Sequence, residues 1–338
     1  MRVDELPLTL GPYPRAAANA ITDVPGVRVG HATITEGDLR TGVTAVVPDV
    51  LGPTRRSLPA GLSVGNGFGK LIGATQIDEL GAIETPVLLT STLSAFRVAD
   101  ALVGHVLSWS GYEDVTTLNP VVGETNDGFL SDVRARGVTA DHVAHALASA
   151  HGGPVEEGCV GAGTGTTALG YKAGIGTSSR VVAVAGADVT VGALVQSNFG
   201  GVLTVAGVPV PADEVLGRAG VQSPGNSCMI LIATDASVDA RQLGRVARRA
   251  IFAMARVGAS FSHGSGDYAL AFSVAEGRPP GDASLDPLFG ATMDAVEEAL
   301  LNSLLMATTT NGTAGRIARA VPTDVVRQRL RAAGALDA

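Results

Sequence analysis

The chain has 338 residues, enough for a large hydrophobic core in one domain or two. Hydrophobic residues make up 46% of it and charged residues 17%, which excludes a disordered chain. A net charge of -8, only two lysines and 4% aromatic residues argue against nucleic acid or a membrane surface as a partner. The sequence starts without the apolar core of a signal peptide and contains no apolar run of membrane-spanning length, so we expect a soluble, cytoplasmic protein.

The first half of the chain alternates short apolar strands with helices. Residues 21–34 and 43–47 predict strands, the first entered from a Pro-Gly turn. The glycine-rich stretch 61–73 predicts a loop or a set of strand ends, and residues 71–80 have helical spacing. A buried strand is predicted over 86–90. A helix then runs from the N-cap Ser94 to Trp109, with one apolar side formed by Phe96, Ala99, Leu102, Val103, Val106 and Leu107.

The second half contains the longer elements. A helix is predicted over 139–150, and residues 181–195 read as two strands joined by a hairpin at 186–188. An amphipathic helix is predicted over 239–257, a strand over 268–274 and a long apolar helix over 289–306. Strands and helices occur in blocks without a strict βαβ rhythm, which predicts a layered α+β fold with stacked sheets between helices.

A nucleotide site finds little support in the sequence. Residues 161–168 match G-x-G-x-x-A, with Asp188 about twenty residues on, as in a dinucleotide-binding fingerprint. Such a site needs a helix directly afterwards, but Gly170, Gly174 and Gly176 interrupt the adjoining stretch of chain. We therefore expect no nucleotide cofactor, while a nucleotide-dependent oxidoreductase stays as an alternative.

Metal and Ser-His-Asp chemistry are also poorly supported. Cys159 and Cys228 cannot form a disulfide framework or a zinc cluster, and their apolar neighbours predict buried, unreactive thiols. The six histidines lack metal-protease spacing, so we expect no metal. We expect no nucleophile elbow of the Ser-His-Asp hydrolases, since the G-x-S-x-G match at residues 61–65 lies within the glycine-rich stretch.

Ser227 is the more informative position. The turn Pro224-Gly225-Asn226 leads through this serine into the apolar run 229–233, which places a hydroxyl at the mouth of a core strand. An ordinary boundary between a loop and a strand would have the same sequence pattern. Three polar segments also lie at the ends of apolar stretches, where binding groups are usually presented: residues 120–128, 196–201 and 262–268.

Taken in order, these segments make the sequence similar to the L-aminopeptidase/D-esterase and β-peptidyl aminopeptidase family, self-processing N-terminal-nucleophile hydrolases. The matching stretches are 21–34, 84–93, 120–128, 158–180, 195–201, 225–236 and 264–273. The resemblance implies a four-layer α/β/β/α sandwich of the ornithine acetyltransferase type. It also implies one peptidase domain, 1–338, that cleaves itself between Asn226 and Ser227 into chains 1–226 and 227–338.

The resemblance further assigns roles to individual residues. Ser227 would be the nucleophile and Asn198 the oxyanion donor, with Ser265 and Asp267 orienting and activating Ser227. Glu124 would bind the free ammonium of a small peptide or amide substrate, as a carboxylate can. The family also suggests a homotetramer of processed heterodimers.

Two positions depart from the family pattern. Asn126 stands where some relatives have an active-site tyrosine, and Lys70 replaces an acidic residue expected in the glycine-rich loop. Both bear on substrate choice. Two alternatives also stay open. One is acyl transfer to an amine, although the related ornithine acetyltransferases use threonine. The other is an uncleaved, non-catalytic homologue.

Overall fold

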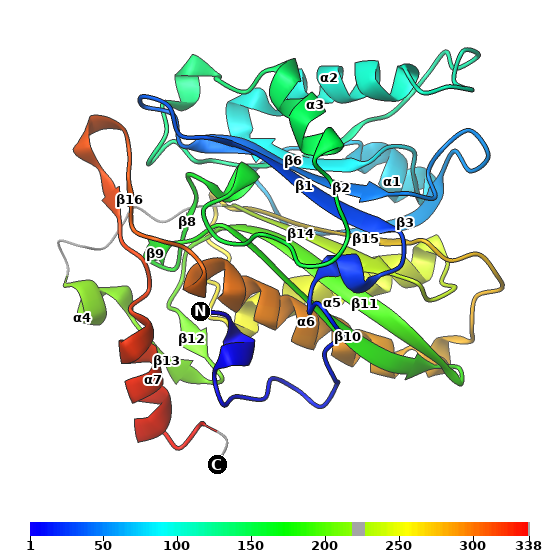
Figure 1. The fold of residues 1–338 in the computed structure, drawn as a ribbon. Coiled ribbons are helices and arrows are strands. Elements are labelled where there is room, and N and C mark those ends of the chain that lie inside the picture. The colour runs from blue at the N-terminus through cyan, green and yellow to red at the C-terminus, as the bar shows by residue number, and fades with distance from the viewer. Residues whose placement is uncertain (218–226, 337–338) are drawn as a thin grey trace.

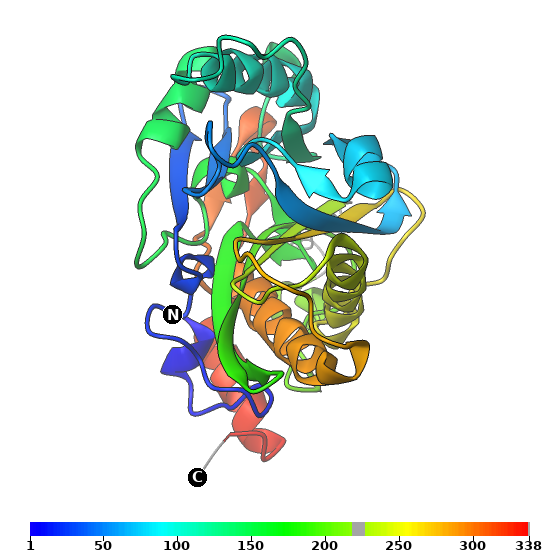
Figure 2. The same cartoon turned by 90° about the vertical axis from the view of Figure 1, so that its right-hand side faces the viewer.

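Two β-sheets stacked face to face form the centre of the molecule, and helices cover the outer face of each sheet (Figures 1 and 2). The computed structural model describes residues 1–217 and 227–336. Three buried apolar clusters separate the layers, one between the sheets and one beneath each helical layer. The predicted α/β/β/α sandwich is therefore confirmed.

The first sheet has the strand order β1-β2-β6-β7-β4. Helices α2 and α3 cover its outer face (Figure 1). β6 and β7 run parallel and the other pairs are antiparallel. The bounds of these elements are β1 Val27–Ile34, β2 Thr41–Pro48, β4 Leu71–Ile72, β6 Val87–Ser91, β7 Val121–Thr125, α2 Ala95–Leu107 and α3 Ala140–Ala148.

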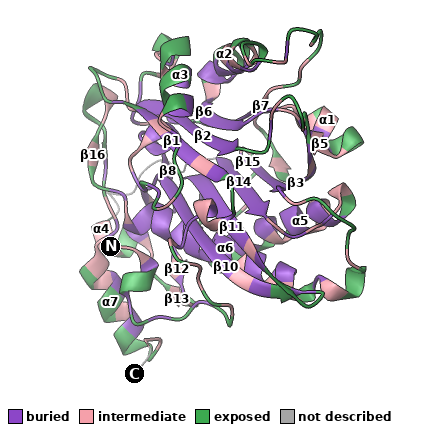
Figure 3. Ribbon diagram, turned by 45° about the vertical axis from the view of Figure 1, so that its right-hand side comes forward, coloured by how far each residue is buried: buried purple, intermediate pink, exposed green. Residues whose placement is uncertain are grey.

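The second sheet has the order β10-β11-β14-β15-β3-β5 and lies on α5 and α6. Its elements are β3 Leu58–Gly67, β5 Ala82–Ile83, β10 Ile175–Val184, β11 Ala187–Asn198, β14 Ser227–Thr234, β15 Gly266–Ser273, α5 Ala240–Arg256 and α6 Asp286–Leu305. Every residue of β14 is buried, and Figure 3 shows the same burial across the centre of the sheet. Cys228 and Ile230 face the helices while Met229 and Leu231 face the other sheet, which explains the unbroken apolar run in this strand.

The remaining elements lie around this sandwich. None of the helices in the described ranges is long and apolar enough to cross a membrane. The smaller elements are α1 Ala74–Leu80, α4 Ala212–Leu216, α7 Thr323–Ala332, β8 Thr167–Ala168, β9 Tyr171–Lys172, β12 Thr204–Val205, β13 Val208–Pro209, β16 Thr310–Asn311 and β17 Ile317–Ala318.

Two local predictions were wrong. Much of the glycine-rich stretch 61–73 belongs to strand β3, because Gly61 lets the strand approach α5: a Cβ there would collide with the backbone of Gly244. The apolar side of α2 was predicted wrongly at Phe96, which is 65% exposed. Ala99, Leu102 and Val106 are buried as predicted, and Ala95 and Val98 complete the buried stripe.

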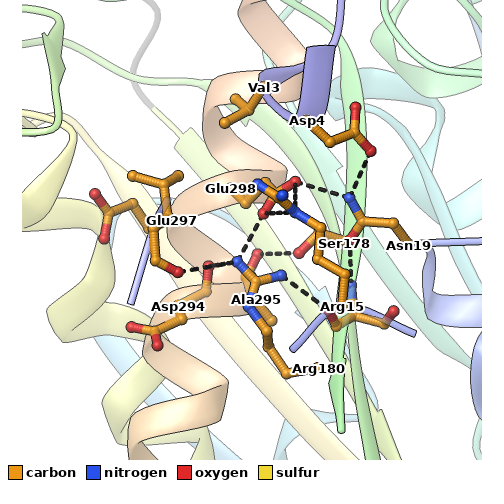
Figure 4. A network of polar contacts seen from close by, with 12 residues as sticks. Val3, Asp4, Arg15, Asn19, Ser178, Arg180, Asp294, Ala295, Glu297 and Glu298 are labelled. Atoms are coloured by element: carbon orange, nitrogen blue, oxygen red, sulfur yellow. Dashed lines mark hydrogen bonds and ion pairs between the residues drawn. The ribbon is translucent and has the colours of Figure 1, made fainter. Parts of the chain in front are cut away.

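A buried ionic network ties the N-terminal segment to this core (Figure 4). Glu298 of α6 accepts hydrogen bonds from Arg180 of β10 at 2.6 Å, from Arg15 at 2.9 Å and from Asn19 at 2.7 Å. Arg180 and Glu298 are almost fully excluded from solvent. A single carboxylate thus joins three segments that are distant in sequence, and its loss would leave a buried guanidinium without its acidic partner.

Candidate active site

Ser227 is the first residue of β14, in the middle of the second sheet. On one side it pairs with Asn198 at the end of β11, and on the other with Gly266 at the start of β15. It is 4% exposed and lines a pocket of about 930 Å³. Asn226, the other residue of the predicted cleavage bond, lies outside the described residues.

Loops from both sheets form this pocket. Glu124 and Asn126 lie at the end of β7 in the first sheet, whereas Ser227 belongs to the second sheet. Three residues predicted to form the site are therefore brought together. The full lining comprises Gly67, Phe68, Gly69, Lys70, Thr92, Glu124, Asn126, Gly128, Phe129, Val133, Thr167, Ser227, Gly264 and Arg316.

The Asn198 side chain is held by hydrogen bonds at both ends of its amide. Its Oδ1 accepts from the backbone N–H of Thr167 at 3.1 Å, and its Nδ2 donates to the backbone carbonyl of Asn126 at 3.1 Å. An amide nitrogen carries two N–H donors, so among the described residues one donor remains beyond the bond to Asn126. The group is thus fixed next to the serine in the register of the sheet, as an oxyanion donor would need to be.

Ser265 and Asp267 contact each other beside the same strand. Ser265 Oγ donates to Asp267 Oδ1 at 2.8 Å, and Asn66 Nδ2 donates to Asp267 Oδ2 at 3.2 Å. Burial raises the pKa of Asp267 above its ordinary value, while the bonds from Ser265 and Asn66 act in the opposite direction. Sequence analysis missed Asn66, because this residue comes from β3, far from Asp267 along the chain, and carries no motif of its own.

Glu124 is already paired in the structure. It is 2% exposed, and its Oε1 accepts from the backbone N–H of Lys70 at 2.8 Å and from Lys70 Nζ at 3.1 Å. Lys70 Nζ also donates to Thr92 Oγ1 at 2.9 Å. Sequence analysis singled out both Glu124 and Lys70 but missed that they form an ion pair.

The loop after Glu124 is organised by its own side chains. Asn126 Oδ1 accepts from the backbone N–H of Gly128 at 3.0 Å, so its side chain stabilises the turn beside the pocket. The next residue, Asp127, is buried and accepts from Ser91 Oγ at 2.7 Å. Burial raises the pKa of Asp127 to about 6, against the hydrogen bond from Ser91.

The glycine-rich segment 161–168 contributes to this pocket and not to a nucleotide fold. It forms a short 3-10 turn, Gly161–Gly163, and then strand β8, where a dinucleotide site would require a helix. Its Thr167 lines the pocket and holds Asn198. Within residues 1–217 and 227–336, no cluster of three or more His, Cys, Asp or Glu residues could hold a metal ion.

The two cysteines differ, and the prediction for Cys159 was wrong. Cys228 is fully buried, and burial raises its pKa well above the usual range. Cys159 is only half-buried. Burial acts to raise the pKa of Cys159 too, but the ammonium of Lys172 and hydrogen bonds from Thr308 outweigh it, so the pKa lies below its ordinary value.

Comparison with known proteins identifies the family. Residues 19–318 match the model of peptidase family S58. The chain is 39% identical to β-peptidyl aminopeptidase BapA of Sphingosinicella xenopeptidilytica, over 94% of this chain and 88% of that protein. The fold superposes on the PH0078 protein from Pyrococcus horikoshii OT3 with a TM-score of 0.92, 41% identity and coverage of 99% and 100%.

A second solved structure is described as a variant of the Ntn hydrolase fold. It is the L-aminopeptidase D-Ala-esterase/amidase from Ochrobactrum anthropi, with a TM-score of 0.91, 35% identity and 99% coverage of both chains. The resemblance inferred from the motifs is confirmed. The chain is a hydrolase of the aminopeptidase kind and belongs to peptidase family S58.

Proposed function

We propose that the chain cleaves itself between Asn226 and Ser227, giving chains 1–226 and 227–338. The processed protein then removes the N-terminal residue from short peptides, amides or esters through an acyl-Ser227 intermediate. The observation that carries this proposal is the position of Ser227, which begins a central strand and lines a pocket together with the buried carboxylate of Glu124. The relative named as a β-peptidyl aminopeptidase supports N-terminal β-amino acid residues as substrates.

Self-cleavage and catalysis use the same hydroxyl. In the first reaction Ser227 Oγ attacks the carbonyl carbon of Asn226, the peptide C–N bond breaks, and an ester forms while the amine of Ser227 is released. Water then hydrolyses the ester. The new α-amine has an ordinary pKa of about 7.7–8.0, which suits it to take the proton from Oγ at neutral pH. One residue thereby supplies both nucleophile and base, so no histidine is needed.

The neighbouring groups fit the remaining steps. During attack on a substrate carbonyl, the amide N–H of Asn198 that is not bonded to Asn126 stabilises the oxyanion. The Ser265 and Asp267 pair orients Ser227, and Glu124 receives the substrate's ammonium. The leaving amine takes up a proton, and water hydrolyses the acyl-serine to restore the enzyme.

Intact-mass analysis with N-terminal sequencing tests the proposal directly. Two fragments are expected, the smaller one beginning Ser-Cys-Met-Ile. Ser227→Ala should give one uncut, inactive chain, whereas the control Ser237→Ala, which alters a serine bonded to the carbonyl of Glu276, should process normally. A single chain that retains full activity would contradict the proposal. Acyl transfer would appear instead as an amide product when an amine is added.

The assembly is proposed on the family resemblance alone. We expect four processed copies to associate in the cytoplasm. Light scattering of the purified protein should give a mass near four times 34.0 kDa, and a monomer mass would refute it.

A further inference from the structure

The pocket presents an ammonium and a carboxylate side by side. Glu124 and Lys70 form an ion pair of 3.1 Å, and the carboxylate is buried while the lysine side chain is 34% exposed. Both residues line the pocket that contains Ser227. The carboxylate that is proposed to bind the substrate's ammonium is therefore not available alone, and any bound amine must share it with Lys70.

Lys70 retains capacity for a further partner. An ammonium has three N–H donors, and Lys70 Nζ uses one on Glu124 and one on Thr92. Its partial exposure leaves the third donor able to reach a group in the pocket. On Glu124, the contacts from Lys70 both fall on Oε1, so that a substrate's ammonium can approach Oε2.

The charges of the pocket lining also favour a substrate that carries a carboxylate. Arg316 lies on the wall, where its guanidinium donates to the backbone carbonyls of Gly128 and Phe129 and rests 5.6 Å from the ring of Phe129. The lining residues thus include two cations, Lys70 and Arg316, against the one carboxylate of Glu124. A substrate that brings only an ammonium would raise the excess from one positive charge to two, whereas one that also brings a carboxylate would leave it at one.

We propose that Lys70 selects substrates whose N-terminal residue carries a carboxylate beside its free ammonium, as in β-aspartyl peptides and amides. This inference rests on the proposed function. A β-aspartyl residue is a β-amino acid whose amine-bearing carbon also bears a carboxylate, so the pair Glu124 and Lys70 is complementary to it: Glu124 receives the ammonium and Lys70 the carboxylate. Lys70 is a specificity-determining residue, while Ser227 still performs the reaction.

Two substrates that differ in one group test the proposal. β-Aspartyl p-nitroanilide and 3-aminobutyryl p-nitroanilide have the same acyl chain and the same leaving group, but the first has a carboxylate where the second has a methyl group. We expect the processed wild-type protein to favour the β-aspartyl compound by at least about tenfold in kcat/KM, the size of one charge-assisted hydrogen bond. Because the carboxylate lies away from the scissile bond, most of the difference should appear in KM.

Substitutions at Lys70 assign the preference to its ammonium. Lys70→Met keeps the length of the side chain but should remove the tenfold preference, so that the ratio of kcat/KM for the two compounds falls to about one. Lys70→Arg should retain a preference. Arg316→Gln removes a positive charge from the same pocket without touching Glu124, and its preference should fall by less than that of Lys70→Met.

The outcomes separate this inference from the proposed function. If 3-aminobutyryl p-nitroanilide is cleaved in a Ser227-dependent reaction but the β-aspartyl compound is not preferred, Lys70 does not select a carboxylate and only this inference fails. Equal losses of preference in Lys70→Met and Arg316→Gln would also overturn it, because a general positive field would then suffice. If a correctly processed protein cleaves neither compound nor any other amide, the proposed function itself is wrong.

Discussion

Asp267→Asn tests whether the carboxylate beside Ser265 supports catalysis. The substitution keeps the shape of the side chain but replaces one oxygen by an NH2 group, in a site where Asp267 now accepts from Ser265 at 2.8 Å and from Asn66 at 3.2 Å. A hydrogen bond to a charged group contributes about 1.5–3 kcal/mol. At about 1.4 kcal/mol per tenfold change, kcat/KM should fall by about 10- to 150-fold.

The pH profile gives a second readout of the same substitution. Burial raises the pKa of Asp267 above its ordinary value, despite the bonds from Ser265 and Asn66. In the proposed role the carboxylate must be ionised, so activity should rise with pH as Asp267 loses its proton, with the midpoint above about pH 4. Asparagine does not titrate, and Asp267→Asn should therefore lose this acidic limb but keep the separate rise at about pH 7.7–8.0 that deprotonation of the Ser227 α-amine causes.

The assay is hydrolysis of 3-aminobutyryl p-nitroanilide between about pH 4 and pH 9, with the fraction of processed chain measured by mass for every sample. Asp49→Asn is the matched control, because Asp49 is a more exposed carboxylate that pairs with Arg28. It should leave both kcat/KM and the acidic limb unchanged. If processed Asp267→Asn stays within about threefold of wild type and keeps the acidic limb, Asp267 does not act on the nucleophile.

Three other predictions concern stability and reactivity. Glu298→Gln should lower the free energy of unfolding by about 3–5 kcal/mol because it breaks a buried ion pair, whereas Asp282→Asn, at an exposed pair, should lower it much less. Equal losses in a denaturant titration would refute the reasoning. Burial raises the pKa of Glu157 to about 7, so between about pH 4.5 and pH 7 the folded state keeps a proton that the unfolded state releases. The free energy of unfolding should therefore fall by about 3 kcal/mol over this pH range. Glu157→Gln should flatten that slope, and a slope unchanged by the substitution would contradict the assignment. Iodoacetamide at neutral pH should label Cys159, whose pKa is lowered, and spare the buried Cys228, as peptide mass mapping would reveal; the reverse pattern would refute it.

The elements with strong patterns were predictable from the sequence. The apolar run of β14 and the amphipathic spacing of α5 each determine an element without help from distant residues. β3 was missed because its glycines are required by contact with α5, a reason that lies outside the strand itself. The blocks of strands and helices predicted stacked sheets between helices, whereas the specific four-layer type came from the family resemblance.

The candidate site, like the fold, could be predicted only in part from the sequence. Glu124, Asn126 and Ser227 were predicted as functional residues, and the structure places all three on one pocket. The pairing of Glu124 with Lys70 was missed because the two residues are 54 positions apart, Lys70 between β3 and β4 and Glu124 in β7. Arg316 carried no motif at all, and only the folded chain brings it to the pocket wall.

The geometry of the site depends on how the two sheets contact each other. Ser227 belongs to one sheet and Glu124 to the other, so the space between the Ser227 hydroxyl and the carboxylate is set by packing between sheets and not by either strand. Gln196, two residues before Asn198, spans this interface, because its Nε2 donates to Thr125 Oγ1 at 2.8 Å and to the carbonyl of Ala162 at 2.9 Å. A buried amide therefore fixes the first sheet against the second next to the reacting groups. The spacing of the two sheets beside the pocket depends on this contact, which a sequence read strand by strand cannot supply.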